Sequence, residues 1–166
     1  AMLSFTSVYA NAQYVDPYEL STFSIIARDP ATGELGAAFQ SKAFAGGNRI
    51  FDAKGGVAVI AHQAVSNPMY GLLGLDLLEA GMSPEDALQQ MVGGDPLRDR
   101  RQVAIVDMKG RTAAWTGPRT DDWKGHHCGT NYCAEGNTLT GPEVLDGMVR
   151  AFETSSLPLA ERLLAA

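Results

Sequence analysis

The first regular pattern of hydrophobic residues begins at Thr22 and consists of two apolar runs, residues 22–28 and 34–40. The turn sequence Asp-Pro-Ala-Thr-Gly lies between them at residues 29–33. Asp bonds its own backbone in turns, Pro fixes φ and Gly tolerates positive φ, so the pattern predicts a β-hairpin. Both arms are apolar at nearly every position, which is typical of strands buried on both faces.

Further strand patterns follow downstream. Residues 55–64 are apolar on both faces and predict one strand. Residues 101–107 and 111–116 flank a short Gly-containing turn and predict a second hairpin. A polar loop over residues 117–129 then leads to a short strand that we expect near residues 131–135.

Four segments have helical patterns. They are residues 70–80, residues 84–92, a segment that opens at the Thr140 pattern and reaches residue 152, and a segment after residue 158. Five leucines crowd one broad face of the first helix. Ser83 is the expected N-cap of the second helix, and Asp86 can complete a capping box with it. Thr140 and Glu143 form the same pattern before the third.

The order of these elements predicts the fold class. It reads hairpin, strand, two helices, hairpin, strand, two helices. Mostly antiparallel strands with helices arriving in pairs are typical of α+β proteins. Two sheets packed face to face, with the helices outside, would bury strands that are apolar on both faces. The sequence therefore predicts a four-layer α-β-β-α sandwich over residues 21–166.

Composition and charge narrow the function classes. The 166 residues are 45% apolar and 19% charged, which are ordinary values for one globular domain. The net charge of −6 argues against nucleic-acid binding and against a polybasic membrane anchor. No apolar run approaches the roughly 20 residues of a membrane span, so we expect none. We expect no cofactor.

The two ends of the chain suggest processing and truncation. Residues 1–12 end in Ala-Asn-Ala, which matches the cleavage pattern of a signal peptide and predicts Gln13 as the mature start. The protein would then be periplasmic or secreted. The basic region of a signal peptide is missing, so an ordinary N-terminal segment of a cytoplasmic protein is the alternative. Residues 13–20 read as an extended lead. The last helix ends inside its apolar stripe, which suggests that the natural protein continues.

Several short motifs occur together in a specific order. They are Thr22–Ile25, Arg28–Gly36, Ser41-Lys42, Gly56-Val57, Gln63-Ala64, Asn67-Pro68, Tyr70-Gly71, Arg101-Gln102, Thr116-Gly117, Gly136-Asn137 and Leu159–Leu164. In this combination they resemble the bacterial and archaeal domain-of-unknown-function family 1028. That family is similar in fold to the N-terminal-nucleophile (Ntn) hydrolases, so the resemblance implies the same sandwich. Its activity is unassigned, and its members usually extend beyond this sequence.

The resemblance implies a catalytic role for Thr22. In Ntn hydrolases the first residue of the mature chain is the nucleophile, and its free α-amine, with a pKa of roughly 7.7–8, is the general base. Thr22 starts the first predicted strand, and Ser41 and Lys42 end the partner strand, so the hairpin can bring them together. Lys42 would stabilise charge beside the nucleophile.

Other polar residues would complete such a site. Ser41, Gln63 and Asn67 are the expected substrate-binding groups, and either Asn67 or the backbone N–H groups at residues 46–47 would stabilise the oxyanion. A start at Gln13 would leave Thr22 without a free amine, so the role requires a second cut before Thr22. The alternative is that Thr22 is a β-forming residue at a strand start.

The cysteines and histidines allow several interpretations. Cys128 and Cys133 form a disulfide across a small loop if the protein is exported. With His126 and His127 they are also a weak metal pattern, although neighbouring histidines rarely converge on one ion. Cys128 beside His127 is a third, catalytic possibility. His62 lies on an apolar strand and is typical of a core histidine.

Two functions remain open at this point. The first is a hydrolase of amide or peptide bonds in a small-molecule or peptide substrate, with Thr22 as nucleophile and Lys42 as charge stabiliser. The second is a catalytically silent sandwich that binds a ligand or partner outside the cytoplasm. A homo-oligomer is compatible with either.

Overall fold

The computed structural model describes residues 20–166. The predicted signal segment, residues 1–12, and nearly all of the extended lead lie outside the described residues. In the described part the fold is mixed α+β, with two antiparallel four-stranded sheets and four α-helices. The predicted α+β class with antiparallel sheets is confirmed. No helix among residues 20–166 is long and apolar enough to cross a membrane.

One sheet is formed by the first two and the last two strands of the chain, and the other by the four strands between them. One has the strand order β2-β1-β8-β7 and the other β3-β4-β5-β6. The strands are β1 Thr22–Arg28, β2 Leu35–Ser41, β3 Phe51–Lys54, β4 Ala58–Ala64, β5 Arg101–Asp107, β6 Thr112–Thr116, β7 Gly125–Gly129 and β8 Tyr132–Asn137. The helices are α1 Met69–Glu79, α2 Pro84–Gly93, α3 Glu143–Thr154 and α4 Leu159–Ala165, with 3₁₀ turns at Gly46–Asn48 and Arg98–Arg100.

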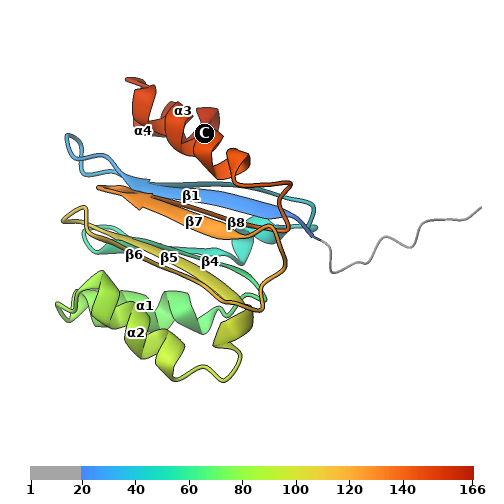
Figure 1. Cartoon of the computed structure of the whole chain (residues 1–166). Coiled ribbons are helices and arrows are strands. Elements are labelled where there is room, and N and C mark those ends of the chain that lie inside the picture. Colours follow the sequence, from blue (N-terminus) through green and yellow to red (C-terminus); the bar gives the residue numbers. More distant parts are fainter. Residues whose placement is uncertain (1–19) are drawn as a thin grey trace, which may run out of the picture.

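The sheets stack face to face, and each carries a pair of helices on its outer side (Figure 1). Helices α1 and α2 cover the β3–β6 sheet, and α3 and α4 cover the other. The inner faces meet through Ile26, Val59, Ala104 and Val106, all of which are buried. These residues sit at every second position of their strands, so the strand period places them on one face.

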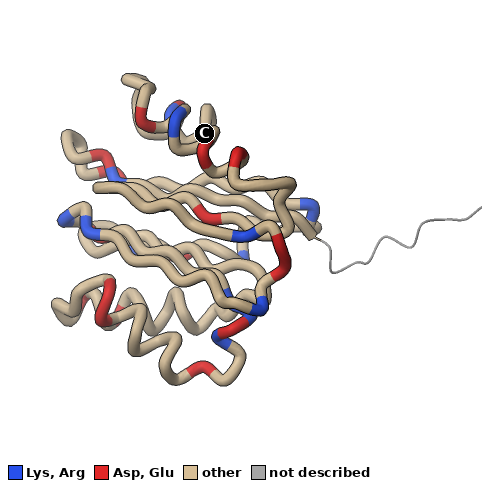
Figure 2. The backbone as a smooth tube through the Cα atoms, in the orientation of Figure 1, with Lys and Arg blue, Asp and Glu red and all other residues tan. Residues whose placement is uncertain are grey.

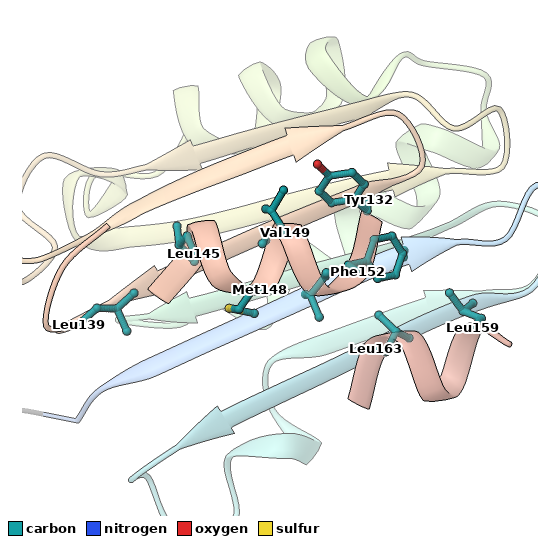
Figure 3. Close-up of a cluster of buried hydrophobic side chains, with 11 residues drawn as sticks. Tyr132, Leu139, Leu145, Met148, Val149, Phe152, Leu159 and Leu163 are labelled. Atoms are coloured by element: carbon teal, nitrogen blue, oxygen red, sulfur yellow. The ribbon is translucent and has the colours of Figure 1, made fainter. Parts of the chain in front are cut away.

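The outer cores are made by the amphipathic faces of the helices. Figure 3 shows the cluster between the first sheet and α3 and α4, where Leu145, Met148 and Phe152 of α3 pack beside Leu159 and Leu163 of α4. Each of these side chains contributes roughly 1.5–3 kcal/mol when fully buried. Helix packing therefore covers the two-sided apolar strands, as the pattern of β1 predicts.

Helix α2 begins as expected and helix α3 does not. The Ser83 hydroxyl accepts a hydrogen bond from the Asp86 backbone N–H at 3.1 Å, which confirms the predicted cap. The predicted capping box of α3 is wrong, because Pro142 occupies its N-cap position and no side chain caps the helix. The Thr140 hydroxyl lies instead 3.4 Å from the Glu143 carboxylate.

Two predicted strands each pair with a preceding strand that was not predicted. Residues 55–57 form a turn, and the strand before it, β3, pairs with β4. Strand β7 lies inside the predicted polar loop and pairs with β8. Its sequence, Gly-His-His-Cys-Gly, has no apolar alternation because β7 is a half-exposed edge strand. The second arm of the first hairpin, β2, is likewise an edge strand and only half-buried.

The leucines of α1 are divided between its buried and its exposed side. Leu72 and Leu73 are 58% and 39% exposed, whereas Tyr70 and Leu78 are buried together with two glycines. Leucines occur at so many positions of this helix that their pattern does not select one side. The small glycines allow the helix to approach the sheet closely.

Gly117 and Gly147 form a matched pair for testing the packing. A Cβ at Gly117 would lie 2.4 Å from the Asp99 carbonyl oxygen, whereas a Cβ at Gly147 in α3 meets nothing within 4 Å. We expect Gly117→Ala to lower the free energy of unfolding by about 1–3 kcal/mol, because backbone must move. Gly147→Ala should raise it by roughly 0.5–1 kcal/mol, because Ala favours a helix interior. Urea denaturation measures both, and an unchanged Gly117→Ala variant would contradict this account.

Candidate functional site

One end of the sandwich opens into a pocket of about 410 Å³. It lies where β1 begins and where β2, β4 and β8 end. Its walls are Leu20, Thr22, Phe39, Ser41, Ala43, Gly46, Arg49, Ile50, Gln63, Ala64, Val65, Ser66, Pro68, Arg100, Arg119, Thr120, Asp121 and Asn137. A volume of this size suits a small-molecule ligand.

Strand register makes this end of the sandwich polar. Thr22 pairs with Ser41 on one side and with Asn137 on the other, and Gln63 pairs with Gln102 in the second sheet. Cross-strand partners point to the same face, so these side chains gather between the sheets. The apolar inner residues occupy the other end of the same strands.

The polar side chains form a buried hydrogen-bond network. The Ser24 hydroxyl donates to Gln63 Oε1 at 2.8 Å, and Gln63 Nε2 donates to Gln102 Oε1 at 2.8 Å. Asn137 Nδ2 donates to the same Gln102 oxygen at 3.0 Å. Gln102 Nε2 donates in turn to the Gly136 carbonyl at 2.8 Å. Satisfied networks of this kind hold their members in one arrangement, so the pocket has a rigid floor.

Thr22 and Ser41 place two hydroxyls side by side at the pocket wall. Thr22 Oγ1 lies 2.8 Å from Ser41 Oγ. The Ser41 oxygen also accepts a hydrogen bond from the Ala43 backbone N–H at 3.0 Å, and in its contact with Thr22 either hydroxyl can donate. Leu20 and Ser21 precede Thr22, so its nitrogen is an amide here.

The structure brings together only part of the predicted site. Thr22, Ser41 and Gln63 line the pocket, whereas Lys42 is exposed and Asn67 lies outside the lining residues. The Asn67 amide donates to Asp95 Oδ2 at 3.2 Å, away from Thr22. Of the two glycines proposed as backbone donors, Gly46 lines the pocket.

Comparison with known proteins identifies the family. The model of DUF1028, a family of unknown function, matches residues 22–166. This chain belongs to the DUF1028 family. A crystal structure of a DUF1028 protein from Silicibacter pomeroyi is similar, with a TM-score of 0.85, 36% sequence identity and 87% of this chain covered. The chain spans 65% of the length of that structure. No curated protein matches the sequence.

Arginines at the pocket of this DUF1028 domain were not predicted from its sequence. Arg49, Arg100 and Arg119 line the pocket, and Asp121 is the one acidic residue among the lining residues. Most strand positions carry no charge, as Figure 2 shows, and three of the four charged lining residues are these exposed arginines. A protein with a net charge of −6 thus has a cationic pocket, which attracts anions.

A buried ion pair supports the wall formed by residues 65–66. Arg101 Nε lies 2.8 Å from Asp95 Oδ2, and both side chains are at least nine-tenths buried. Although burial alone raises the pKa of the Asp95 carboxyl, the bond from Arg101 holds it well below its usual range. Arg101 also donates to the carbonyl oxygens of Val65 and Ser66. The ion pair therefore holds the backbone of this wall in place.

A disulfide joins the two cysteines of the β7–β8 hairpin. Cys128 and Cys133 are register partners with Cα atoms 4.1 Å apart, and they are bonded to each other as predicted. Neither sulfur is then a free thiolate. The metal pattern and the role of Cys128 as a nucleophile therefore do not apply to this form of the protein.

Glu135 gives a test of the polar interior. Both its carboxylate oxygens are buried without a hydrogen-bond partner, and burial raises the pKa of this carboxyl well above its usual value. The folded state keeps a proton that the unfolded state loses near pH 4.3, so native stability falls as the pH rises above that value. We expect Glu135→Gln to abolish this loss, which amounts to at most about 1.4 kcal/mol per pH unit.

Urea denaturation across the range from about pH 4 to about pH 7 measures this difference. The Gln variant should gain stability over the native protein as the pH rises. Glu143→Gln, at an exposed position, is the matched control, and its free energy of unfolding should depend on pH as that of the native protein does. If the free energies of unfolding of Glu135→Gln and the native protein differed by the same amount at every pH, Glu135 would ionise alike in the folded and unfolded states, and the prediction would be wrong.

Proposed function

We propose that this DUF1028 domain is an Ntn-like amide hydrolase that uses Thr22 as its nucleophile. The observation that carries the proposal is the position of Thr22, at the first residue of β1, with its hydroxyl in the pocket wall and beside Ser41. The stacked sheets with helices on both outer sides support it, because Ntn hydrolases share the α-β-β-α order. Fold analogy alone is a weak argument for function, so the proposal depends on the site.

The proposed mechanism requires cleavage between Ser21 and Thr22. The freed α-amine takes the proton of Thr22 Oγ1 while this oxygen attacks the amide carbon of the substrate. The amine of the leaving group receives that proton as the C–N bond breaks, and water then hydrolyses the acyl ester on Thr22. Ser41 orients the Thr22 hydroxyl through the 2.8 Å contact. In this mechanism the side chain beside the nucleophile is Ser41, whereas the sequence suggested Lys42.

The cationic pocket suggests the class of substrate. Three arginines from separate segments of the chain surround a space of about 410 Å³. Guanidinium groups bind carboxylates through paired hydrogen bonds. We therefore propose a small amide that carries a carboxylate, such as an N-acyl amino acid. Export of the protein is also part of the proposal, and the disulfide is compatible with an oxidising compartment.

A binding module is the second candidate. The observation in its favour is the peptide bond before Thr22, because an amide nitrogen is no general base at neutral pH. The same pocket would then hold an anionic ligand without turnover. The two candidates differ in what happens when Thr22 becomes the first residue.

The decisive comparison is between a chain that starts at Thr22 and one that keeps residues 13–21. A removable fusion partner generates both starts, and mass spectrometry verifies them. We expect the Thr22 start to hydrolyse N-acyl amino acids and the longer chain to be inactive. Thr22→Ser should retain activity and Thr22→Ala should lose at least about 100-fold in kcat, because the nucleophile is removed.

Thr32→Ala is the matched control for Thr22→Ala, because Thr32 is exposed in the β1–β2 turn and lies outside the pocket lining. Hydrolysis that survives Thr22→Ala in the Thr22-start chain would refute the nucleophile role. Binding of the same compounds without hydrolysis by either chain would favour the binding module.

Arg119 tests the proposed substrate charge. We expect Arg119→Gln to weaken binding of N-acetylglutamate by roughly 10-fold, because a charge-assisted hydrogen bond contributes about 1.5–3 kcal/mol. Binding of the neutral diamide of the same compound should change little. Isothermal titration calorimetry measures both, with Arg150→Gln on the exposed side of α3 as control. Equal losses for both compounds would contradict charge recognition.

A further inference from the structure

Another hydroxyl-bearing residue of the pocket lining has the partners of an activated nucleophile. Ser66 lies in the connection after β4 and lines the pocket. Its Oγ is 2.8 Å from Nδ1 of His62, and His62 Nε2 is 2.8 Å from Asp52 Oδ2. The three side chains thus form an unbroken Ser–His–Asp chain of hydrogen bonds.

We propose that Ser66 is an esterase nucleophile, with His62 as its general base and Asp52 as the positioning residue for His62. This activity is separate from the amide hydrolysis proposed for Thr22. It requires no free α-amine, because the base is a side chain. The chain in its uncut form can therefore carry it out.

Asp52 determines which nitrogen of His62 carries the proton. An ionised carboxylate only accepts hydrogen bonds, so Nε2 must be the donor toward Asp52. Nδ1 then carries the lone pair and can accept the Ser66 proton at 2.8 Å, a shorter contact than the 3.4 Å from Ser66 Oγ to the Arg49 carbonyl oxygen. The ring is used in the opposite sense to that of the chymotrypsin-type triad, where Nε2 faces the serine. Its role as base is the same, because each nitrogen can take up a proton when the other donates.

Strand pairing and helix packing hold this arrangement together. Asp52 on β3 pairs with Ile60 on β4, and His62 is the next residue along the same face. His62 is 1% exposed, so its ring has little freedom to turn away. The first turn of α1 closes over Asp52, since a Cβ at Gly71 would lie within van der Waals overlap of the Asp52 carboxylate. The N-terminal end of this helix favours a negative charge there.

The backbone around Ser66 also departs from a regular strand end. Ala64 has a φ of 63°, in the left-handed region, and the Ser66 N–H donates to the Ala64 carbonyl at 2.9 Å. Arg101 holds the Ser66 carbonyl oxygen from the other side at 3.1 Å. A non-glycine residue in this conformation persists only when its surroundings enforce it, and such strain concentrates at functional sites. At this bend the Ser66 hydroxyl lies against His62.

The proposed reaction begins when Ser66 Oγ attacks the carbonyl carbon of an ester and His62 Nδ1 takes the hydroxyl proton. The carbon–oxygen bond to the leaving group then breaks, and that oxygen receives the proton from Nδ1. Water next attacks the acyl-Ser66 ester, again losing its proton to Nδ1. Ser66 Oγ recovers this proton as the carboxylic acid leaves. No oxidant, metal or further reactant is needed.

The test uses the uncut chain, with residues before Thr22 retained, so that Thr22 has no amine base. A fluorophosphonate is the probe, because a serine with a base beside it displaces fluoride and keeps the phosphonyl group. Peptide mass spectrometry then locates the label. We expect it on Ser66, with no label in Ser66→Ala. His62→Asn should slow labelling by at least about 100-fold, the usual contribution of a general base.

The controls distinguish a loss of labelling caused by the missing side chain from one caused by unfolding. Ser156→Ala removes an exposed serine between α3 and α4 and should leave labelling unchanged. Thermal melting verifies that each variant is folded. If His62→Asn does not fold, Asp52→Asn provides the second variant, because it keeps the shape of the side chain that contacts His62 and removes only its charge. It should slow labelling while the protein stays folded.

Turnover of p-nitrophenyl acetate distinguishes positioning from structural support. Asp52→Asn should lower kcat by about 10-fold or more with little change in KM, and Asp52→Glu should recover part of the loss. Absence of label from folded native protein, or a label on Ser41 or Ser156 in place of Ser66, would overturn the proposal. Neither result bears on Thr22, whose test depends on the cut chain.

Discussion

The contact between the two inner sheet faces is the constraint on which the rest of the structure depends. Each inner face is apolar at one end, where Ile26 meets Val59 and Ala104, and polar at the other, where Ser24 meets Gln63 and Gln102. The apolar half supplies the burial energy that holds the sheets together. The polar half is close-packed only because nearly every donor and acceptor finds a partner, and a pocket forms where this network reaches the surface.

The Asp95–Arg101 pair connects the polar half to the helical layer. Arg101 begins β5, while Asp95 lies after α2, and Arg101 also contacts the segment that contains Ser66. Removing one partner of a buried ion pair costs more than the pair contributes, because the other charge stays buried. The wall that carries Ser66 is thereby coupled to the packing of α2, although no residue of that helix reaches the pocket.

Local chemistry explains what the sequence predicts well. The β1–β2 hairpin follows from its turn residues, and the N-cap at Ser83 follows from hydroxyl geometry that involves only neighbouring residues. Strand β7 is not predictable in this way, because an edge strand gains its stability from the backbone of β8 and needs no apolar side chains. The same limit applies to α1, whose buried side is chosen by the sheet below it.

The residues of the candidate site likewise fall into those that strand alternation predicts and those that only the folded chain brings together. Ser41 and Gln63 are predictable because they end strands whose register with Thr22 and Gln102 follows from alternation. Lys42 fails by that same rule, since the residue after Ser41 points away from the face that Thr22 shares with Ser41. The arginines come from three separate loops, and only the folded chain brings these together. No motif in the sequence marks them.

His62 shows how one position satisfies two interpretations at once. Its burial and its two hydrogen bonds make it a satisfied core histidine, as the apolar strand suggests. Those two bonds also place a carboxylate and a pocket hydroxyl on opposite nitrogens, an arrangement that a structural role alone does not require. Spacing along the chain conceals it, because Asp52 belongs to β3, a strand that the apolar pattern of residues 55–64 does not include. The pocket thus receives the Thr22 and Ser41 hydroxyls from the first sheet and the Ser66 hydroxyl from the connection after β4. In the two proposals, Thr22 depends on cleavage for its base, while Ser66 has its base within the fold.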